Sequence, residues 1–298
     1  MGIVYWSQGV GLANRLRALV GYMAMSEVLE KPFYLCWTPD IYCDASFSEL
    51  FTCPSGIHLI TLQQKELLEQ ESNISTYTDN IWFDKIWENH LSNSISWPSF
   101  SNHINACFQR LRPCSDISKE LNLFLNKNNL SHCFGIHIRL TDNAGQYKIW
   151  TETVSAFKPS CISKLQGFEN FIRDSLQQDS STKIFLATDN QEIEQKFIQL
   201  FPDHIITYPK TFKPEVHRKF SWRNLKFKSQ QQRTSSVQDA LIEMLLLAKC
   251  RCIVGTYFSS FSKLSSFFSD TSLDYFEIHG DSYVKSNYLK KLKGNIPF

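Results

Sequence analysis

The feature that most constrains the fold is an alternation of short apolar runs with longer segments of helical periodicity. In the second half of the chain the expected strands lie at 134–139, 184–187, 205–207, 252–254 and 275–278. Segments with apolar residues at helical spacing lie between or after them, at 168–176, 192–201, 237–249 and 260–268. Strands separated by helices of this length imply right-handed crossovers and a parallel sheet.

The start of the chain has the same pattern. An apolar run at 3–6 leads into a glycine-containing turn, and helical spacing follows until Lys31-Pro32 ends it. Another apolar run follows at 33–37, whereas residues 63–131 are polar and predict helices with little strand signal. We therefore predict an α/β fold with two domains, 1–131 and 132–298. A ligand is expected in the cleft between them, near the carboxyl ends of the strands.

Composition excludes several classes of protein. The chain has 298 residues, 43% hydrophobic and 20% charged, as in soluble globular proteins. A net charge of +2 gives no nucleic-acid footprint, and no run approaches the roughly 20 apolar residues of a membrane span. The first residues do not resemble a signal peptide, so we expect a cytoplasmic location. The nine cysteines form no CxxC pair, which favours free thiols, several of them buried, and no structural metal.

The first glycine turn is a candidate ligand loop. Gly11, Asn14 and Arg15 lie where an expected strand meets a helix N-terminus, and such ends bind anions. The turn lacks the third glycine of a dinucleotide fingerprint and the Lys-Ser/Thr of a P-loop. A tight turn with Asn14 and Arg15 on a solvated helical turn is an equally good interpretation.

The segment from Phe134 to Asn143 carries the strongest functional signal. His137 and Arg139 alternate on one strand, so both point to the same face, and Asp142 follows. The planar guanidinium of Arg139 matches a phosphate bidentately. The structural alternative pairs Arg139 with Asp142 and buries His137 in the core. A shared polar face at a strand end favours ligand binding.

Two later segments also join strands to helices. Thr188-Asp189-Asn190 follows an apolar run, and Asp189 or Asn190 suits a helix N-cap better than chemistry. Ser259 and Ser260 begin a helix after the apolar run at 252–254, and they either bind phosphate or cap that helix.

Asp239 and Glu243 are spaced to share one face of an otherwise apolar helix. They could accept hydrogen bonds from a base edge or a ribose, or they could form a solvated face.

Residues 209–236 are basic, with interleaved aromatic side chains. We predict a mobile flap that includes Lys210 and closes Arg233 over a diphosphate. A solvated loop and a platform for a glycan acceptor are the alternatives.

These segments resemble glycosyltransferases that use GDP-fucose: the bacterial nodulation and animal core α1,6-fucosyltransferases and the protein O-fucosyltransferases. The resemblance is greatest to a bacterial group with HIRRTDN, LATDD and DALxDLYLLS…SSFS segments. The corresponding residues here are His137-Ile-Arg-Leu-Thr-Asp-Asn143, Leu186-Ala-Thr-Asp-Asn190, Asp239-Ala-Leu-Ile-Glu-Met-Leu-Leu-Leu-Ala248 and Ser259-Ser-Phe-Ser262. The opening Gly-Leu-Ala-Asn14-Arg15 also resembles the family's first loop.

The resemblance implies a GT-B fold, with two Rossmann-like domains and the donor in the C-terminal one. It implies that Arg139 contacts the donor diphosphate and His137 the nucleotide. The family's guanine-recognising acid falls on Glu243, with Asp239 beside it, and its phosphate-site serines fall on Ser259 and Ser260.

The chain departs from the pattern at Leu140, which replaces the second arginine of the HxRR form. The stretch after Asp142 is longer than usual. Glu152 is our first choice for the catalytic carboxylate, and Asp142 is the second.

The expected activity is inverting, metal-independent fucosyl transfer from GDP-fucose to a hydroxyl of a glycan or glycoconjugate acceptor. No cofactor is expected, since the chain has no HExxH or DxD pair in a metal-binding context, and arginines would stabilise the diphosphate. A different nucleotide-sugar donor on the same fold, or a non-catalytic nucleotide- or glycan-binding module, is the alternative.

Overall fold

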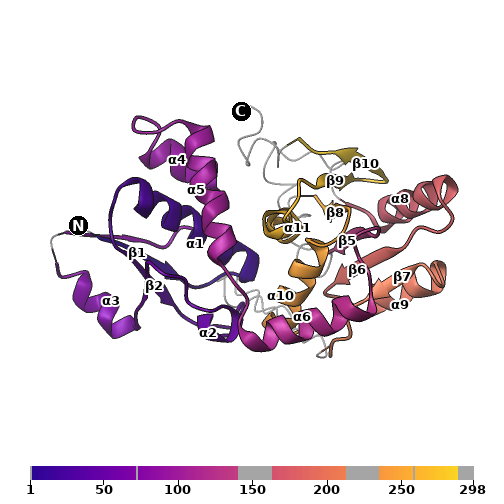
Figure 1. Cartoon of the computed structure of the whole chain (residues 1–298), viewed down its shortest axis with the longest axis horizontal. Helices are drawn as coiled ribbons and strands as arrows, with labels where there is room; N and C mark the ends of the chain where they lie inside the picture. The colour runs from indigo at the N-terminus through magenta and orange to yellow at the C-terminus, as the bar shows by residue number, and fades with distance from the viewer. Residues whose placement is uncertain (1, 72, 140–162, 213–234, 258, 288–298) are drawn as a thin grey trace, which may run out of the picture.

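The chain folds into two α/β domains that lie side by side, as Figure 1 shows. The computed structural model describes residues 2–71, 73–139, 163–212, 235–257 and 259–287. The first sheet is wholly parallel, in the order β3-β2-β1-β4. Its strands are β1 (Gly2–Ser7), β2 (Phe33–Trp37), β3 (Ile57–Leu59) and β4 (Ile74–Tyr77).

The second sheet has the order β10-β9-β8-β5-β6-β7 and is parallel except for β10. Its strands are β5 (Phe134–Ile138), β6 (Ile184–Thr188), β7 (Ile205–Thr207), β8 (Cys252–Thr256), β9 (Asp274–His279) and β10 (Ser282–Lys285). Strands β6 and β8 are buried along their whole length, as expected of parallel strands covered on both faces.

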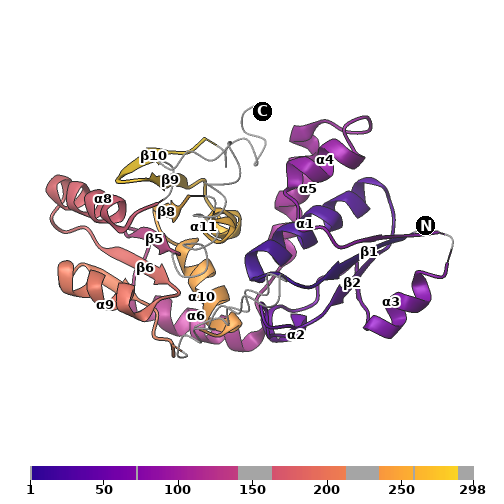
Figure 2. The same cartoon turned by 180° about the vertical axis from the view of Figure 1, so that it is seen from behind.

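Helices cover both sheets (Figures 1 and 2). Those that follow the first strands are α1 (Leu12–Val28), α2 (Phe47–Leu50), α3 (Leu62–Leu68), α4 (Phe83–His90) and α5 (Trp97–Arg110). In the second domain α8 (Leu165–Gln178) and α9 (Gln191–Leu200) share one apolar cluster with the sheet. The other face of that sheet meets α10 (Val237–Leu247), α11 (Ser260–Ser265) and the 3₁₀ turn η2 (Ser266–Phe268).

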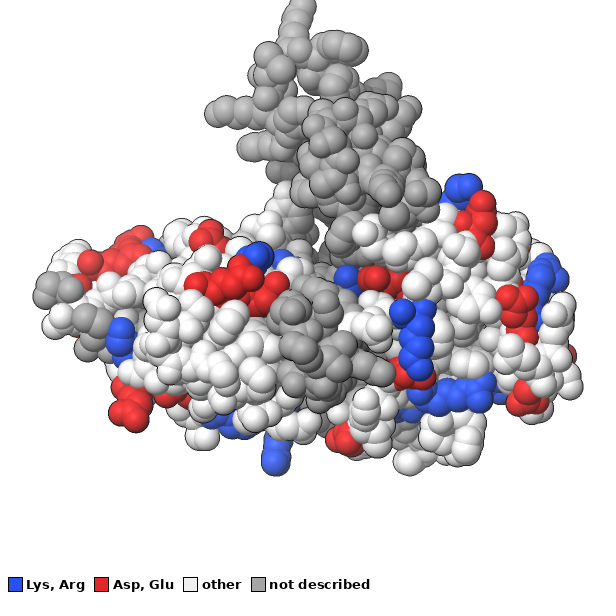
Figure 3. Space-filling view, turned by 90° about the horizontal axis from the view of Figure 1, so that it is seen from above, with Lys and Arg blue, Asp and Glu red and all other residues white. Residues whose placement is uncertain are grey.

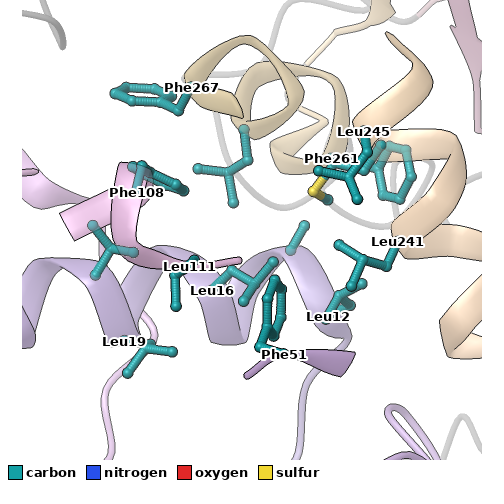
Figure 4. Packing of buried hydrophobic residues seen from close by; sticks show 14 of the residues in the cluster. Leu12, Leu16, Leu19, Phe51, Phe108, Leu111, Leu241, Leu245, Phe261 and Phe267 are labelled. Carbon is teal, nitrogen blue, oxygen red and sulfur yellow. The ribbon is translucent and has the colours of Figure 1, made fainter. Parts of the chain in front are cut away.

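One continuous apolar core joins the two domains. Figure 4 shows Leu16 of α1 and Phe108 of α5 pointing toward Phe261 and Phe267 of the second domain. The Phe108 and Phe267 rings stack with centroids 4.8 Å apart, and Phe83 meets Phe267 edge-on at 5.5 Å. Because close-packed interiors resist displacement, this contact fixes how the two sheets face each other.

Helix α6 (Ser115–Lys127) crosses from the first domain to the second. Phe124 on this helix lies edge-on to Phe185 of β6 and to Tyr208, with ring centroids 6.0 and 5.7 Å apart. The helix precedes residue 132, the predicted start of the second domain, yet it packs on the second sheet. The division at 131/132 stays a prediction.

The α/β alternation is confirmed, and three strands, β3, β4 and β10, were missed. All five strands expected from 134 onward form, and the helix expected at 237–249 spans Val237–Leu247. Strand β4 lies in the stretch expected to be mostly helical, and β10 follows the last expected strand. Both are short strands at a sheet edge with no fully buried residue, so neither has the apolar run that marks the central strands.

Acidic and basic side chains are interspersed on the face drawn in Figure 3. No helix in the described part of the chain is long and apolar enough to cross a membrane. The eight described cysteines are free thiols, and Cys36, Cys133 and Cys252 are buried as expected.

Candidate functional site

The second sheet reverses its strand order between β5 and β8. From β5 the chain proceeds outward through β6 and β7, then returns to the other side of β5 to form β8 and β9. Open α/β sheets bind ligands at such a switch point, beyond the carboxyl ends of the strands. The residues after β5 and β8 therefore define the candidate site.

A threonine side chain joins these two strand ends. The backbone pairing of β5 with β8 stops at His137 and Gly255. Beyond it, the Arg139 N–H donates to the Thr256 hydroxyl at 2.9 Å, and that hydroxyl donates to the His137 carbonyl at 3.2 Å. Thr256 thus holds the backbone that carries Arg139. Thr256 was not predicted as a site residue, although a polar residue that ends a buried strand was a usable signal.

His137 is buried against α11. Its ring stacks on Phe261 with centroids 4.5 Å apart, and its Nδ1 lies 3.5 Å from the Ser259 hydroxyl. Ser259 is the N-cap residue of α11, as the capping alternative expected, but its side chain makes no cap hydrogen bond. Asn190, in contrast, caps α9 by accepting from the Ile193 N–H at 3.0 Å, as predicted.

Gly255 lets α11 approach the sheet. A Cβ at this position would overlap the Ser262 hydroxyl and come within 2.5 Å of the Tyr275 hydroxyl. Glycine here places the start of α11, with Ser259 and Ser260, directly beside the ends of β5 and β8.

The two domains also meet at this point through a hydrogen bond. The Ser260 hydroxyl donates to the Asn14 side-chain oxygen at 2.9 Å. Both residues were expected near a donor, and the structure brings them together from positions 246 residues apart. Gly11 ends the same loop and is the N-cap residue of α1.

Arg15 does not lie on a solvated helical turn and cannot contact a donor as the structure stands. Its side chain is 0% exposed and donates to the carbonyls of Val10 at 2.9 Å, Ser7 at 3.1 Å and Thr38 at 2.6 Å. It also forms a 2.6 Å ion pair with Asp40. The predicted donor role of Arg15 is therefore wrong, because its guanidinium holds the ends of β1 and β2 together.

Glu243 lies in a buried ion cluster rather than on a solvated face. Its carboxylate pairs with the ammonium of Lys210, which also pairs with Glu194 at 3.0 Å. The Lys210 side chain is 0% exposed, so the prediction that it belongs to a mobile basic flap is wrong. Asp239 lies one turn earlier on α10, partly exposed, and Ser236 caps that helix.

The ends of β8 and β9 carry an aromatic pair that the sequence analysis missed. The rings of Tyr257 and His279 lie with centroids 4.4 Å apart. Ser163 ties them to the sheet, since its hydroxyl accepts from the Tyr257 N–H at 2.8 Å and donates to the Ile278 carbonyl at 2.6 Å. This aromatic pair joins the ends of two neighbouring strands that are distant in sequence, so no local sequence pattern predicts it.

Three predicted site residues, Asp142, Glu152 and Arg233, lie outside the described residues, as does most of the 209–236 segment. Among the residues that are described, no group of three or more His, Cys, Asp or Glu side chains could hold a metal ion. The described site thus comprises His137, Arg139 and Thr256 at the strand ends, the Ser259–Ser260 pair, Asn14, and the Lys210 cluster.

No family model matches the chain, and no curated protein is similar to it in sequence. Solved structures do match. The α-1,6-fucosyltransferase NodZ, co-crystallised with GDP, is 15% identical with a TM-score of 0.57, over 96% of this chain and 98% of that one. A further structure of NodZ, from Bradyrhizobium, has the same values.

Two other solved structures extend the likeness. POFUT1 in complex with GDP is 11% identical with a TM-score of 0.52, over 93% of this chain and 98% of that one. FUT1 from Arabidopsis thaliana in complex with GDP is 13% identical with the same TM-score, over 93% of this chain and 70% of that one. The resemblance noted in the sequence is confirmed at the level of fold: this chain has the two-domain GT-B architecture of solved fucosyltransferases.

Proposed function

We propose that the protein is an inverting glycosyltransferase that transfers fucose from GDP-fucose to a hydroxyl of a glycan acceptor. The observation that carries this proposal is the position of His137 and Arg139 at the switch point of a sheet whose whole two-domain fold is shared with GDP-bound fucosyltransferases. Ligands of open α/β folds bind at that point.

The reaction is a direct displacement. The acceptor hydroxyl attacks the anomeric carbon, the bond from that carbon to the β-phosphate oxygen breaks, and GDP leaves with the electron pair. A carboxylate accepts the hydroxyl proton, and Glu152, or Asp142 in second place, is the proposed base.

Arg139 is the proposed partner of the leaving diphosphate. Its guanidinium is permanently charged and can donate two parallel hydrogen bonds to phosphate oxygens. The Thr256 hydroxyl accepts a hydrogen bond from the Arg139 N–H, which fixes the position of the Arg139 backbone. Charge stabilisation by arginine would replace the metal ion that other nucleotide-sugar enzymes use.

A different nucleotide-sugar donor, or a module that binds nucleotide without catalysis, remains the second candidate. The fold supports both, because one architecture carries many activities. Donor hydrolysis in the absence of acceptor distinguishes an enzyme from a binding module.

Thermal unfolding with GDP, UDP, ADP and CDP tests the donor assignment. Turnover of GDP-fucose in the presence of EDTA tests whether the reaction is independent of a metal ion. GDP at 100 times its Kd stabilises the native state by about 2.7 kcal/mol. We expect GDP to give the largest shift and turnover to persist in EDTA. Equal shifts with all four nucleotides would contradict guanine recognition. Turnover lost to EDTA and restored by manganese would contradict metal independence.

A further inference from the structure

The cluster of Lys210, Glu194 and Glu243 joins three separate elements behind the candidate site. Lys210 follows β7, Glu194 lies on α9 and Glu243 lies on α10. The Lys210 ammonium bonds to Glu243 Oε1 and to Glu194 Oε2, and it lies 5.0 Å from the centre of the Phe212 ring. Exposed fractions of the side chains are 0% for Lys210, 5% for Glu243 and 15% for Glu194.

Carboxylates outnumber ammonium groups in this cluster. Asp189, at the end of β6, and Glu194 both act on Glu243 through their negative charge. Asp239 lies one turn earlier on the same helix. Tyr208 packs nearby, and the negative charges of Asp239 and Glu243 act to raise its pKa. Lys210 is the cation that pairs with Glu243 among the described residues.

Burial raises the pKa of Glu243 to about 7, even though Lys210 acts to lower it. Burial alone would lower the pKa of Lys210, but the charges and hydrogen bonds of Glu243 and Glu194 together raise it. Near neutral pH the lysine is therefore charged, and its charge opposes protonation of the glutamate. Small changes around Glu243 decide whether it accepts hydrogen bonds or donates one.

We propose that Lys210 is a positioning residue for base recognition, which holds the Glu243 carboxylate ionised and in place to accept N–H groups from a guanine edge. This inference rests on the proposed function, since it assumes that GDP binds beside α10. Guanine presents adjacent N–H donors on one edge, whereas the adenine ring presents an unprotonated ring nitrogen there. Only the ionised form of Glu243 can accept two such bonds.

The test compares GDP with ADP across pH by calorimetry on the full chain. Both ligands carry the same diphosphate, so the ratio of their Kd values removes the titration of the phosphates. In the wild type we expect the preference for GDP to be complete well above pH 7 and to fall as the pH drops through about 7, because protonation removes the acceptor.

Lys210→Met removes the cation, so it should raise the pH at which the preference is lost. It should also reduce the preference at neutral pH by about 10- to 100-fold, the size of one hydrogen bond to a charged group. Lys210→Arg keeps the charge and should retain a midpoint close to that of the wild type.

Glu194→Gln provides an independent variant with the opposite sign. It removes a negative charge that raises the pKa of Glu243, so the preference for GDP should persist to lower pH. Lys196→Met is the matched control, because Lys196 of α9 pairs with Glu169 of α8 at 2.7 Å and its side chain is 46% exposed. It should leave the midpoint unchanged.

The outcomes separate the two claims. If the wild type prefers GDP but Lys210→Met and Glu194→Gln keep the wild-type midpoint, this inference is wrong and the proposed function stands. If Lys210→Met does not fold, Glu194→Gln alone decides, since its downward shift supports the role and an unchanged midpoint contradicts it. If the wild type binds no GDP, the proposed function fails and this inference fails with it.

Discussion

The carboxyl edges of the two sheets use arginine in opposite ways. After β1, Arg15 is 0% exposed and bonds to three backbone carbonyls and to Asp40. After β5, the backbone of Arg139 is fixed by Thr256, and its side chain is partly exposed at the switch point. The first arginine stabilises its sheet edge, and the second is the proposed partner of a diphosphate.

The difference arises from the surroundings of each strand end. Arg15 lies in the first turn of α1, which packs on β1 and β2, and the Ser7 and Thr38 carbonyls converge on its guanidinium. Trp37 also lies against it, with the ring centroid 5.1 Å away. An arginine near a strand end therefore does not by itself indicate a phosphate site, because backbone carbonyls can take its donors as they do at Arg15.

Replacing Arg15 should give the largest change in stability. Arg15→Met removes the guanidinium donors to the Ser7 and Thr38 carbonyls and leaves Asp40 without its cation. We expect a loss of about 3 kcal/mol in the free energy of unfolding, the lower end for breaking a buried ion pair. Urea denaturation measures it, with exposed Arg112→Met as the control, which should stay within about 0.5 kcal/mol of the wild type. A loss no larger than the control's would show that Arg15 does not stabilise the fold.

Arg139→Lys should act on turnover rather than on stability. A lysine keeps the charge but cannot copy the bidentate fork, and hydrogen bonds to charged groups contribute roughly 1.5–3 kcal/mol. We expect kcat/KM for GDP-fucose to fall about 10- to 100-fold with little change in Tm. Arg173→Lys, on the exposed face of α8, is the control. Near wild-type kcat/KM in Arg139→Lys would make Arg139 a structural residue like Arg15.

Thr256→Val should produce a smaller effect of the same kind. It removes a hydroxyl that bonds to both the Arg139 N–H and the His137 carbonyl. A lost hydrogen bond costs about 1 kcal/mol, so the loss of both bonds should reduce the free energy of GDP binding or of unfolding by a few kcal/mol at most. Thr188→Val at the end of β6 is the matched control, since its hydroxyl accepts one long 3.3 Å bond from the Asn190 N–H. Equal GDP affinity in both variants would remove Thr256 from the site.

The sequence predicted the parts of this molecule that depend on local pattern. Buried parallel strands such as β6 and β8 are continuous apolar runs, and helix α10 is apolar around most of its surface. Edge strands β4 and β10 have no such run, because half their surface faces water. Fold class therefore followed from the sequence, and the sheet edges did not.

The site was predictable only in part, because burial of a charge depends on distant residues. His137 and Arg139 were identified from their alternation on one strand. In the sequence, Lys210 is one of several basic residues in the predicted flap. In the structure it is buried and pairs with two glutamates from other elements. Ser260 and Asn14 were each expected to meet a ligand, and their bond to each other depends on how the two domains pack.

Amide hydrogen exchange with and without GDP tests the central claim, that the nucleotide binds at the carboxyl edge of the second sheet. With GDP saturating, we expect slower exchange in peptides covering β5, β8, α10 and the start of α11. Peptides covering β1 and β2 should exchange as in the free protein, since Arg15 leaves no phosphate site there. Slower exchange confined to β1, β2 and the start of α1 would contradict the account and place the nucleotide at the first sheet.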